Sequence, residues 1–385
     1  MKKVALVMIA VGASLAVAQE IDIGAIKQRV WEKNQEQARD DSGVIAGRAA
    51  QFLIASQGKD GGWKSDKGPG ITALVLLGLV RDPTIGPKHP AVQRGLEFMR
   101  RYHREDGGIY GGEGLLKSYE TSVALSLYAA LKDPALAPLI ERAQKFLKDN
   151  QWDEGESKSL DDVFYGGAGY GSGKRPDLSN VNIMLDALRD SGLSKDDPTY
   201  QKAIAFISRC QMRGESNDQP FAKEATDGGF IYSPANGGES KAGEIEVGGK
   251  KQLRTYGSMT YAGYKSLLYC GVSPGDPRVK AARDWIGRHW TLDFNPNMPE
   301  KQSREGLYYY YHVLARALAA SGDEIVVDPQ GNEHLWRAEL IKRLQQLQKR
   351  DGSFVNEEDR WMEGEPELTT AYALLTVQTT YPRNQ

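Results

Sequence analysis

Three residues of this 385-residue sequence combine a type and a position that could support acid–base chemistry. Glu120 and Glu367 each begin a stretch that carries almost no charge and is typical of a buried helix. A carboxyl group there can be kept protonated by burial, or it can be an ordinary first-turn carboxylate that balances the helix dipole. His312 can act as a general base if it faces a cavity, although a lone buried histidine is more often structural. Glu120, Glu367 and His312 are therefore the candidate catalytic residues.

Aromatic residues around His312 could form a ligand-binding lining. The four tyrosines at 308–311 point in different directions on a helix, so at least one should face the interior, and Tyr308 lies one turn before His312 on the same face. Aromatic rings bind apolar or sugar-like ligands and stabilise cations. The candidate ligand-binding residues are Tyr308, Tyr311, Tyr256, Tyr261, Tyr372, Trp361 and Arg304. The alternative, a packed aromatic core whose hydroxyl groups bond to loop backbone, stays open.

The sequence offers no pattern for a metal, a nucleotide or a covalent intermediate. It contains neither His-Glu-x-x-His nor a nucleophile elbow, and the run at 171–175 departs from a phosphate-binding loop at both ends. Only Cys210 and Cys270 could form a disulfide, and we expect them at the C-terminal ends of two antiparallel helices, most of a helix length apart. We therefore expect no metal, no cofactor and two separate buried thiols.

A repeated pattern indicates the elements that must position these residues. Six times an amphipathic helix is followed by a glycine-rich turn and then by a helix of small and apolar residues, the first instance running from 49–54 through 57–63 to 71–77. The charged helix of each pair should face water and the uncharged one should be buried. The spacing of the turns is irregular, which favours a closed ring over an open solenoid of fixed pitch. The sequence predicts an all-α fold, an (α/α)6 toroid of six helical hairpins.

The residues of the glycine-rich turns have a structural explanation. Glycine can supply the positive φ at which an outer helix ends, and the aspartate before it can accept hydrogen bonds from backbone amides just beyond. The aromatic residues of these turns should then stack beside the next outer helix, and they are Trp63, Tyr110, Phe230 and Phe354. We interpret these turns as structural and not as catalytic.

The turn at Gln57–Trp63, Gln-x-x-Asp-Gly-Gly-Trp, and its variant at Gln348–Phe354 resemble the repeats of the prenyltransferase and squalene-cyclase superfamily. The resemblance covers roughly residues 45–380. It implies the α/α toroid of the terpenoid cyclases and protein prenyltransferases, with a central cavity that receives isoprenoid chains in the enzymes of the family. If this chain is active, the resemblance implies chemistry of the terpene cyclase and mutase type.

The catalytic motifs of that superfamily are absent from the sequence. No Asp-x-Asp-Asp occurs, and the nearest approaches are Asp161-Asp162 and Glu365-Pro366-Glu367. The run from Ser303 to Glu305, followed by Tyr311 and His312, is similar to the histidine segment of the prenyltransferases, but 256–259 offers no Asp-x-Cys for their zinc. The Gly-Cys-Gly-Glu-Gln motif of thioester domains is missing as well. Whether the protein is an enzyme stays open.

The beginning of the chain is typical of an exported protein. Lys2 and Lys3 precede an apolar run that is too short to span a bilayer, and Ala16-Val17-Ala18 forms a small-x-small cleavage site. We expect a signal peptide at 1–18, an N-terminal helical extension at 19–44 and the toroid at 45–385. The mature protein should be periplasmic or extracellular, without an integral membrane segment. A net charge of -2 gives no indication of a nucleic-acid partner.

Two functions fit these observations. The first is an exported toroid that binds an apolar, isoprenoid-like ligand in a central aromatic cavity, with or without catalysis. The second is a non-catalytic secreted scaffold, or a toroid that binds a polysaccharide or cleaves it as a lyase does. The expected partner is therefore an apolar small molecule or a glycan, and export favours the second function because polyprenyl substrates are made inside the cell.

Overall fold

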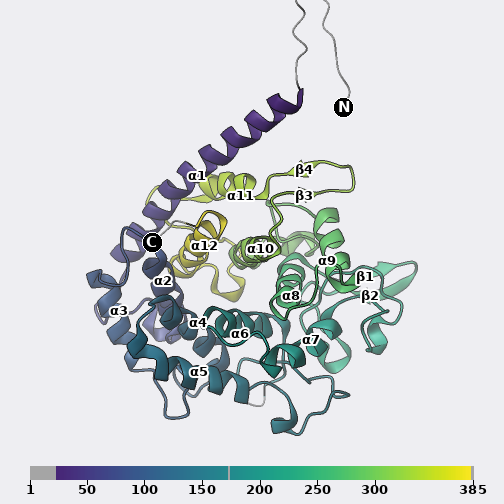
Figure 1. The fold of residues 1–385 in the computed structure, drawn as a ribbon, viewed down its shortest axis with the longest axis horizontal. Coiled ribbons are helices and arrows are strands. Elements are labelled where there is room, and N and C mark those ends of the chain that lie inside the picture. Colours follow the sequence, from purple (N-terminus) through teal and green to yellow (C-terminus); the bar gives the residue numbers. More distant parts are fainter. Residues whose placement is uncertain (1–22, 172–173, 383–385) are drawn as a thin grey trace, which may run out of the picture.

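A computed structural model describes residues 23–171 and 174–382 of the chain. The expected signal peptide at 1–18 lies outside these residues and stays a prediction. The chain begins with α1 (Ile23–Ala55), a single helix that runs through the expected boundary between the extension and the toroid at 44/45. Its first half projects from the body of the molecule (Figure 1). None of the helices described is long and apolar enough to cross a membrane.

The helices form two concentric rings (Figure 1). The outer helices are α1, α3 (Pro90–Arg100), α5 (Ala137–Asp149), α7 (Pro198–Cys210), α9 (Pro277–Arg288) and α11 (Trp336–Leu347). The inner helices are α2 (Gly70–Arg81), α4 (Lys117–Ala130), α6 (Leu178–Asp190), α8 (Gly257–Tyr269), α10 (Leu307–Ser321) and α12 (Pro366–Thr380). Each inner helix contacts the next in chain order, and α12 contacts α2. The ring is therefore closed, which confirms the predicted (α/α)6 toroid.

Burial separates the two kinds of helix as the sequence pattern predicts. Every residue of α2 from Gly70 to Val80 is buried, whereas α5 buries only Ala143, Phe146 and Leu147. Two short antiparallel pairs of strands lie in the connections: β1 (Glu244–Val247) with β2 (Lys250–Leu253), and β3 (Val326–Val327) with β4 (Glu333–His334). They lie outside the helical rings and leave the core to the helices.

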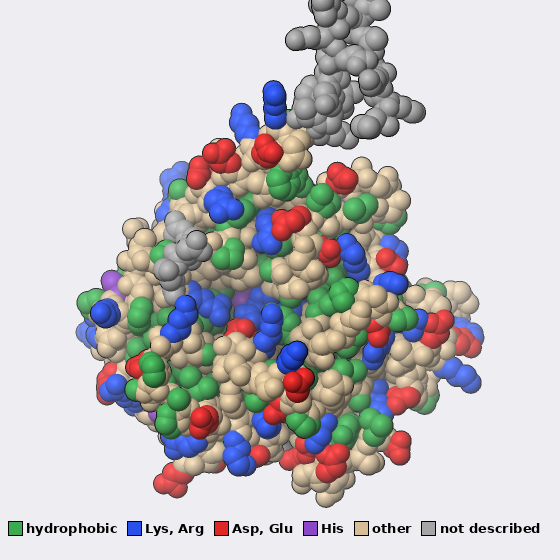
Figure 2. All heavy atoms as spheres, viewed as in Figure 1, with side chains coloured by type: hydrophobic (Ala, Val, Ile, Leu, Met, Phe, Trp, Pro, Cys, Tyr) green, Lys and Arg blue, Asp and Glu red, His purple; other side chains and the backbone are tan. Residues whose placement is uncertain are grey.

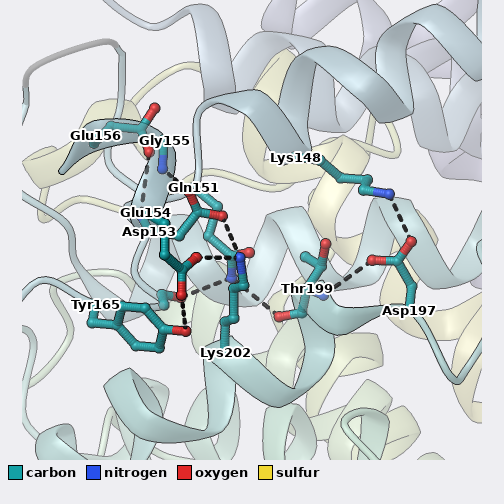
Figure 3. Close-up of polar contacts among 11 residues, drawn as sticks. Lys148, Gln151, Asp153, Glu154, Gly155, Glu156, Tyr165, Asp197, Thr199 and Lys202 are labelled. Carbon is teal, nitrogen blue, oxygen red and sulfur yellow. Dashed lines mark hydrogen bonds and ion pairs between the residues drawn. The ribbon is translucent and has the colours of Figure 1, made fainter. Parts of the chain in front are cut away.

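A glutamine in four of the turns joins each hairpin to the next outer helix. The side-chain amide of Gln151 donates to the carbonyl of Gly166 in its own turn and to that of Thr199 in the first turn of α7 (Figure 3). The same pair of bonds is made by Gln57 to Gly61 and Ala91, by Gln211 to Gly228 and Arg278, and by Gln348 to Gly352 and Ile45. These glutamines hold neighbouring repeats in register around the ring.

The turn glycines lie directly against the next outer helix. Gly166 has a φ of +80°, and a Cβ atom there would clash with the backbone carbonyl of Lys202 on α7. Gly61, Gly107, Gly228 and Gly352 share the positive φ and the same close approach to a backbone carbonyl. The aspartates that precede these glycines in four turns accept from a backbone amide two residues ahead, and they are Asp60, Asp106, Asp227 and Asp351. The positive φ of the glycines and the hydrogen bonds of the aspartates are confirmed, but the glycines lie five or more residues beyond the outer helices and do not end them.

The turn aromatics follow the expectation only in part. Tyr110 stacks on Phe146 of the next outer helix, with ring centroids 5.9 Å apart. Trp63, in contrast, is buried and donates its indole N–H to Leu53 on its own outer helix, α1, at 2.6 Å. In the second repeat Ile109 and not Tyr110 takes the place of Trp63, because its amide bonds to Thr121 as that of Trp63 bonds to Thr72.

The two cysteines stand where the repeats place them. Cys210 ends α7 and Cys270 follows α8 directly, and both are buried free thiols. Burial raises the pKa of the Cys270 thiol to about 12. Neither thiol is therefore a reactive thiolate at neutral pH.

Replacing Gly166 by alanine tests the close approach of turn and outer helix. Gly192 has nearly the same φ, +83°, but open space where a Cβ would lie, so Gly192→Ala is the matched control. Both variants carry the strain of a left-handed alanine, on the order of 1 kcal/mol, and only Gly166→Ala adds the clash with Lys202. We expect its free energy of unfolding in urea to be lower than that of Gly192→Ala by about 2 kcal/mol. Equal losses would show that the turn does not press on α7.

Candidate functional site

The ring encloses a cavity of about 320 Å³, referred to below as the upper cavity. First-turn residues of the inner helices line it, among them Gly70, Glu120, Ser179, Ser258 and Leu368, so it lies at the N-terminal end of the ring. The aromatic side chains of the lining are Tyr119, Tyr170, Tyr232, Tyr256, Tyr309, Tyr372 and Trp361. Ile71, Ile183 and Met259 add aliphatic surface. The cavity is therefore mainly apolar and aromatic, which is the usual character of a small-molecule site.

A second, smaller space of about 40 Å³, the lower compartment, continues toward the C-terminal ends of the inner helices. Four side chains line both spaces: Tyr119, Ile183, Tyr309 and Tyr372. The hydroxyl groups of Tyr119 and Tyr372 lie 3.2 Å apart, and the rings of Tyr309 and Tyr372 meet edge to face. A layer of three tyrosines and Ile183 thus separates the two spaces.

The predicted site residues are divided by the structure into two groups. Glu120, Tyr256, Tyr372 and Trp361 line the upper cavity, and His312 lines the lower compartment together with Tyr372. Three of them come from the inner helices α4, α10 and α12, whereas Tyr256 immediately precedes α8 and Trp361 lies in the connection before α12. The fold brings all five to the axis of the ring.

Five other predicted residues are placed elsewhere. Tyr308 packs edge to face against Phe354, Tyr311 donates its hydroxyl to the carbonyl of Leu292, and Tyr261 contacts Tyr310. All three are therefore part of the wall between helices. Glu367 lies 3.6 Å from the ammonium group of Lys64, and neither it nor Arg304 is among the residues that line the two spaces.

The rotation of α10 explains the error at Tyr308. His312 does face the axis, but the tyrosine that shares this face is Tyr309, three residues before it, with Arg316 following four residues after. A residue either three or four positions before His312 can share its helix face, so the sequence was compatible with Tyr309 as well as with Tyr308. Tyr308 and Tyr311 fall on the flanks of that face, where Tyr308 contacts the turn before α12 and Tyr311 contacts Arg343 of α11.

Glu120 is a buried carboxyl group at the wall of the upper cavity. It lies in the first turn of α4 with an exposed fraction of 4%, and one of its oxygens accepts from the amide of Gly111 at 2.9 Å. Burial raises its pKa from 4.5 to about 7, more than the Gly111 amide and Arg104 lower it. The expectation that burial can keep this carboxyl group protonated is consistent with the geometry.

Glu363 is a second buried acid of the upper cavity, which the sequence analysis missed. It accepts from the amides of Tyr308 and Tyr309, at 3.2 and 2.8 Å, and from the side chain of Asn356 at 2.7 Å, so it caps α10 from a neighbouring loop. Burial raises its pKa to about 7 despite these donors. Three glutamates, at 363, 365 and 367, lie just before α12 or in its first turn, and no pattern among them marks the one that turns inward.

His312 is a neutral histidine in a cationic environment. Burial lowers its pKa well below 6.5, and the charges of Arg316, Lys265 and Arg81 lower it further. Its Nδ1 has no hydrogen-bond partner among the described residues. His312 is therefore available as an uncharged hydrogen-bonding group, and it is too weakly basic to be a strong general base.

A network of buried charges lies below His312. The ammonium group of Lys265 on α8 lies 2.6 Å from both carboxylate oxygens of Asp186 on α6. Arg316 on α10 approaches Asp186 at 3.3 Å and Asp190 at 3.0 Å, and Arg81 reaches Asp190 at 3.4 Å. Burial lowers the pKa of Lys265 to about 8, against the attraction of Asp186. Seen down the ring in Figure 2, Lys and Arg side chains gather around the central hollow.

The described residues offer no metal centre. Among them, no group of three or more His, Cys, Asp or Glu residues has an arrangement that could hold a metal ion. The polar groups of the two spaces are carboxyl groups, tyrosine and serine hydroxyls, an asparagine, a histidine and the cationic groups of Lys67, Lys241 and Arg316. The site can therefore bind an apolar molecule and offer it a few directed hydrogen bonds.

The raised pKa of Glu120 predicts how stability changes with pH. The native state binds more protons than the unfolded state between pH 4.5 and about 7, so the free energy of unfolding should fall as the pH rises through this range. Glu120→Gln keeps an acceptor for Gly111 and removes the titration. The slope should then be shallower by up to about 1.4 kcal/mol per pH unit, measured by urea unfolding from pH 4.5 to 8. Both proteins should be similarly stable at pH 4.5, and identical slopes would contradict the raised pKa.

No family model matches the sequence, and no curated protein matches it significantly. Solved structures do. The type II terpene cyclase MstE from Scytonema, in complex with geranylgeranyl dihydroxybenzoate, aligns with a TM-score of 0.57 and 14% identity over 90% of this chain and 99% of that one. A D-mannose isomerase aligns with a TM-score of 0.54 and 13% identity over 88% and 97%. An alpha-amylase from Clostridium perfringens aligns with a TM-score of 0.53 and 11% identity over 87% of this chain and 97% of that one. The chain thus has the α/α toroid fold of a type II terpene cyclase, a fold that proteins with quite different activities share.

Proposed function

We propose that this protein binds an apolar, isoprenoid-like ligand in the upper cavity. The observation that carries the proposal is the lining, in which six tyrosines, one tryptophan and several aliphatic side chains surround a space of about 320 Å³. Burying an apolar chain against such a surface is favourable by roughly 25 cal/mol per Å². Most of the surface of the lining is aromatic and aliphatic, so the apolar ligand is favoured over the polysaccharide.

The fold comparison supports the same class of ligand. MstE was solved with a geranylgeranyl chain bound, and it aligns with nearly the whole of this chain. The likeness concerns the fold, and the tyrosine lining is the independent feature that makes this particular toroid suited to an apolar guest.

Ligand binding, and not cyclisation, is the activity we propose. Protonation of an alkene needs an unusually strong carboxylic acid, which a group of neighbouring carboxyls can provide. Glu120 and Glu363 are instead weak acids, because burial raises the pKa of each to about 7. Their part in the proposal is to present uncharged carboxyl groups to an apolar ligand at neutral or lower pH.

We also propose that the protein works outside the cytoplasm. The support is the basic start, the short apolar run and the cleavage pattern at residues 1–18. An exported protein of this kind would keep in aqueous solution an apolar ligand that is poorly soluble by itself.

Narrowing the cavity tests the proposed function. Ile183 borders both spaces, so Ile183→Trp should occupy part of the volume that the ligand needs. Leu160→Trp adds the same side chain at an exposed position and is the control. We expect wild type and Leu160→Trp to bind farnesol and geranylgeraniol in isothermal titration calorimetry, and Ile183→Trp to bind them at least about tenfold more weakly. Absence of binding by the wild type, or equal affinity of all three proteins, would refute the proposal.

A further inference from the structure

The lower compartment lies directly beneath the upper cavity, and polar and charged side chains interrupt its otherwise apolar wall. At roughly 10–15 Å³ for each water, its 40 Å³ corresponds to about three waters, or to one small polar group. Its wall combines leucine and valine side chains with Ser126, Asn182, Asp186, His312 and Arg316. The space is therefore too small for a second ligand and large enough for the end of one.

Two polar residues of this wall have unused hydrogen-bonding capacity. Neither Oδ1 of Asn182 nor Nδ1 of His312 has a partner among the described residues. The amide nitrogen of Asn182 makes only a long contact of 3.5 Å with the hydroxyl of Tyr309. Buried polar groups in native proteins are nearly always paired, with protein or with ordered water, so these two groups can bond to water or to the polar end of a ligand in the compartment.

Three cations and two carboxylates form ion pairs around the compartment, which leaves one positive charge in excess. Arg81, Lys265 and Arg316 face the two carboxylates Asp186 and Asp190, and the C-terminal ends of the inner helices add partial negative charge at this end of the ring. His312 is neutral. An anionic group would compete with Asp186 and Asp190 for these cations, whereas an uncharged group that both donates and accepts hydrogen bonds would leave the ion pairs intact.

We infer that the lower compartment binds the hydroxyl group of an alcohol whose apolar chain occupies the upper cavity. This inference rests on the proposed function and adds the chemical class of the ligand. A hydroxyl can donate to Oδ1 of Asn182 and accept from His312 when Nδ1 carries the proton. To reach the compartment, the chain passes between Tyr119, Tyr309 and Tyr372, which border both spaces, and it parts the contact between the hydroxyl groups of Tyr119 and Tyr372.

Three ligands with the same chain and different ends test the inference on the unmodified protein. We expect farnesol to bind about tenfold more tightly than the hydrocarbon farnesene, and more tightly than farnesoic acid, in isothermal titration calorimetry at pH 7.5. Equal affinities for farnesol and farnesene would overturn the inference and leave the proposed function standing. Tightest binding of the acid would overturn it in favour of an anion site. Failure of all three to bind would refute the proposed function, and the inference with it.

Two variants test whether Asn182 and His312 bind the hydroxyl group. Asn182→Leu and His312→Phe should each weaken farnesol binding toward that of farnesene while farnesene binding changes by less than about twofold. His289→Phe, which alters a half-buried histidine stacked on Trp285 away from both spaces, should keep the full preference. If both Asn182→Leu and His312→Phe still bind farnesol more tightly than farnesene by the wild-type factor, Asn182 and His312 do not bind the hydroxyl group. If either variant does not fold, the ligand series on the wild type still decides.

Discussion

The contact between a turn glycine and the backbone of the next outer helix is the constraint on which this structure depends. At Gly166 the turn passes so close to α7 that no side chain fits between them, and Gln151 bonds the two backbones together at the same point. Comparable contacts recur around the ring, so the angle between successive hairpins is fixed by backbone and not by adaptable side chains. The inner helices then meet as a closed barrel, and a central space is left where they cannot all reach the axis.

The two ends of that space differ because the inner helices run parallel. At their N-terminal ends, Glu120 lies in the first turn of α4, and Glu363 accepts a backbone hydrogen bond of α10 from a loop. Both are buried acids beside aromatic rings. Their C-terminal ends attract cations, which Asp186 and Asp190 partly neutralise. The layer of Tyr119, Tyr309 and Tyr372 lies between the upper cavity and the compartment that holds His312 and Arg316. This polarity along the axis is the basis for expecting a ligand with two unlike ends.

The sequence predicted the fold more completely than the site. The turn around Gln57 and its variants are local patterns with local causes, and counting six of them was enough to expect a closed ring. Which side chain faces the axis depends on the rotation of each helix by a fraction of a turn, which periodicity leaves undetermined among four successive tyrosines. Tyr309 was therefore missed in favour of Tyr308. Glu363 was missed for another reason, since it reaches the cavity from a loop whose path is set by its bonds to α10 and Asn356.

The ring is closed by the two ends of the chain. Gln348 donates to Ile45 of α1, and Gln378 donates to Gly78 of α2, partners that lie 303 and 300 positions apart in the sequence. Contacts of such long range form late, because the loop that they close must first be ordered. During synthesis the first five hairpins therefore leave the ribosome before the sixth can close the ring. Until then the apolar surfaces that the first and last hairpins bury against each other are exposed to water. Synthesis of this protein thus passes through an aggregation-prone intermediate with exposed apolar surface, of the kind that chaperones bind.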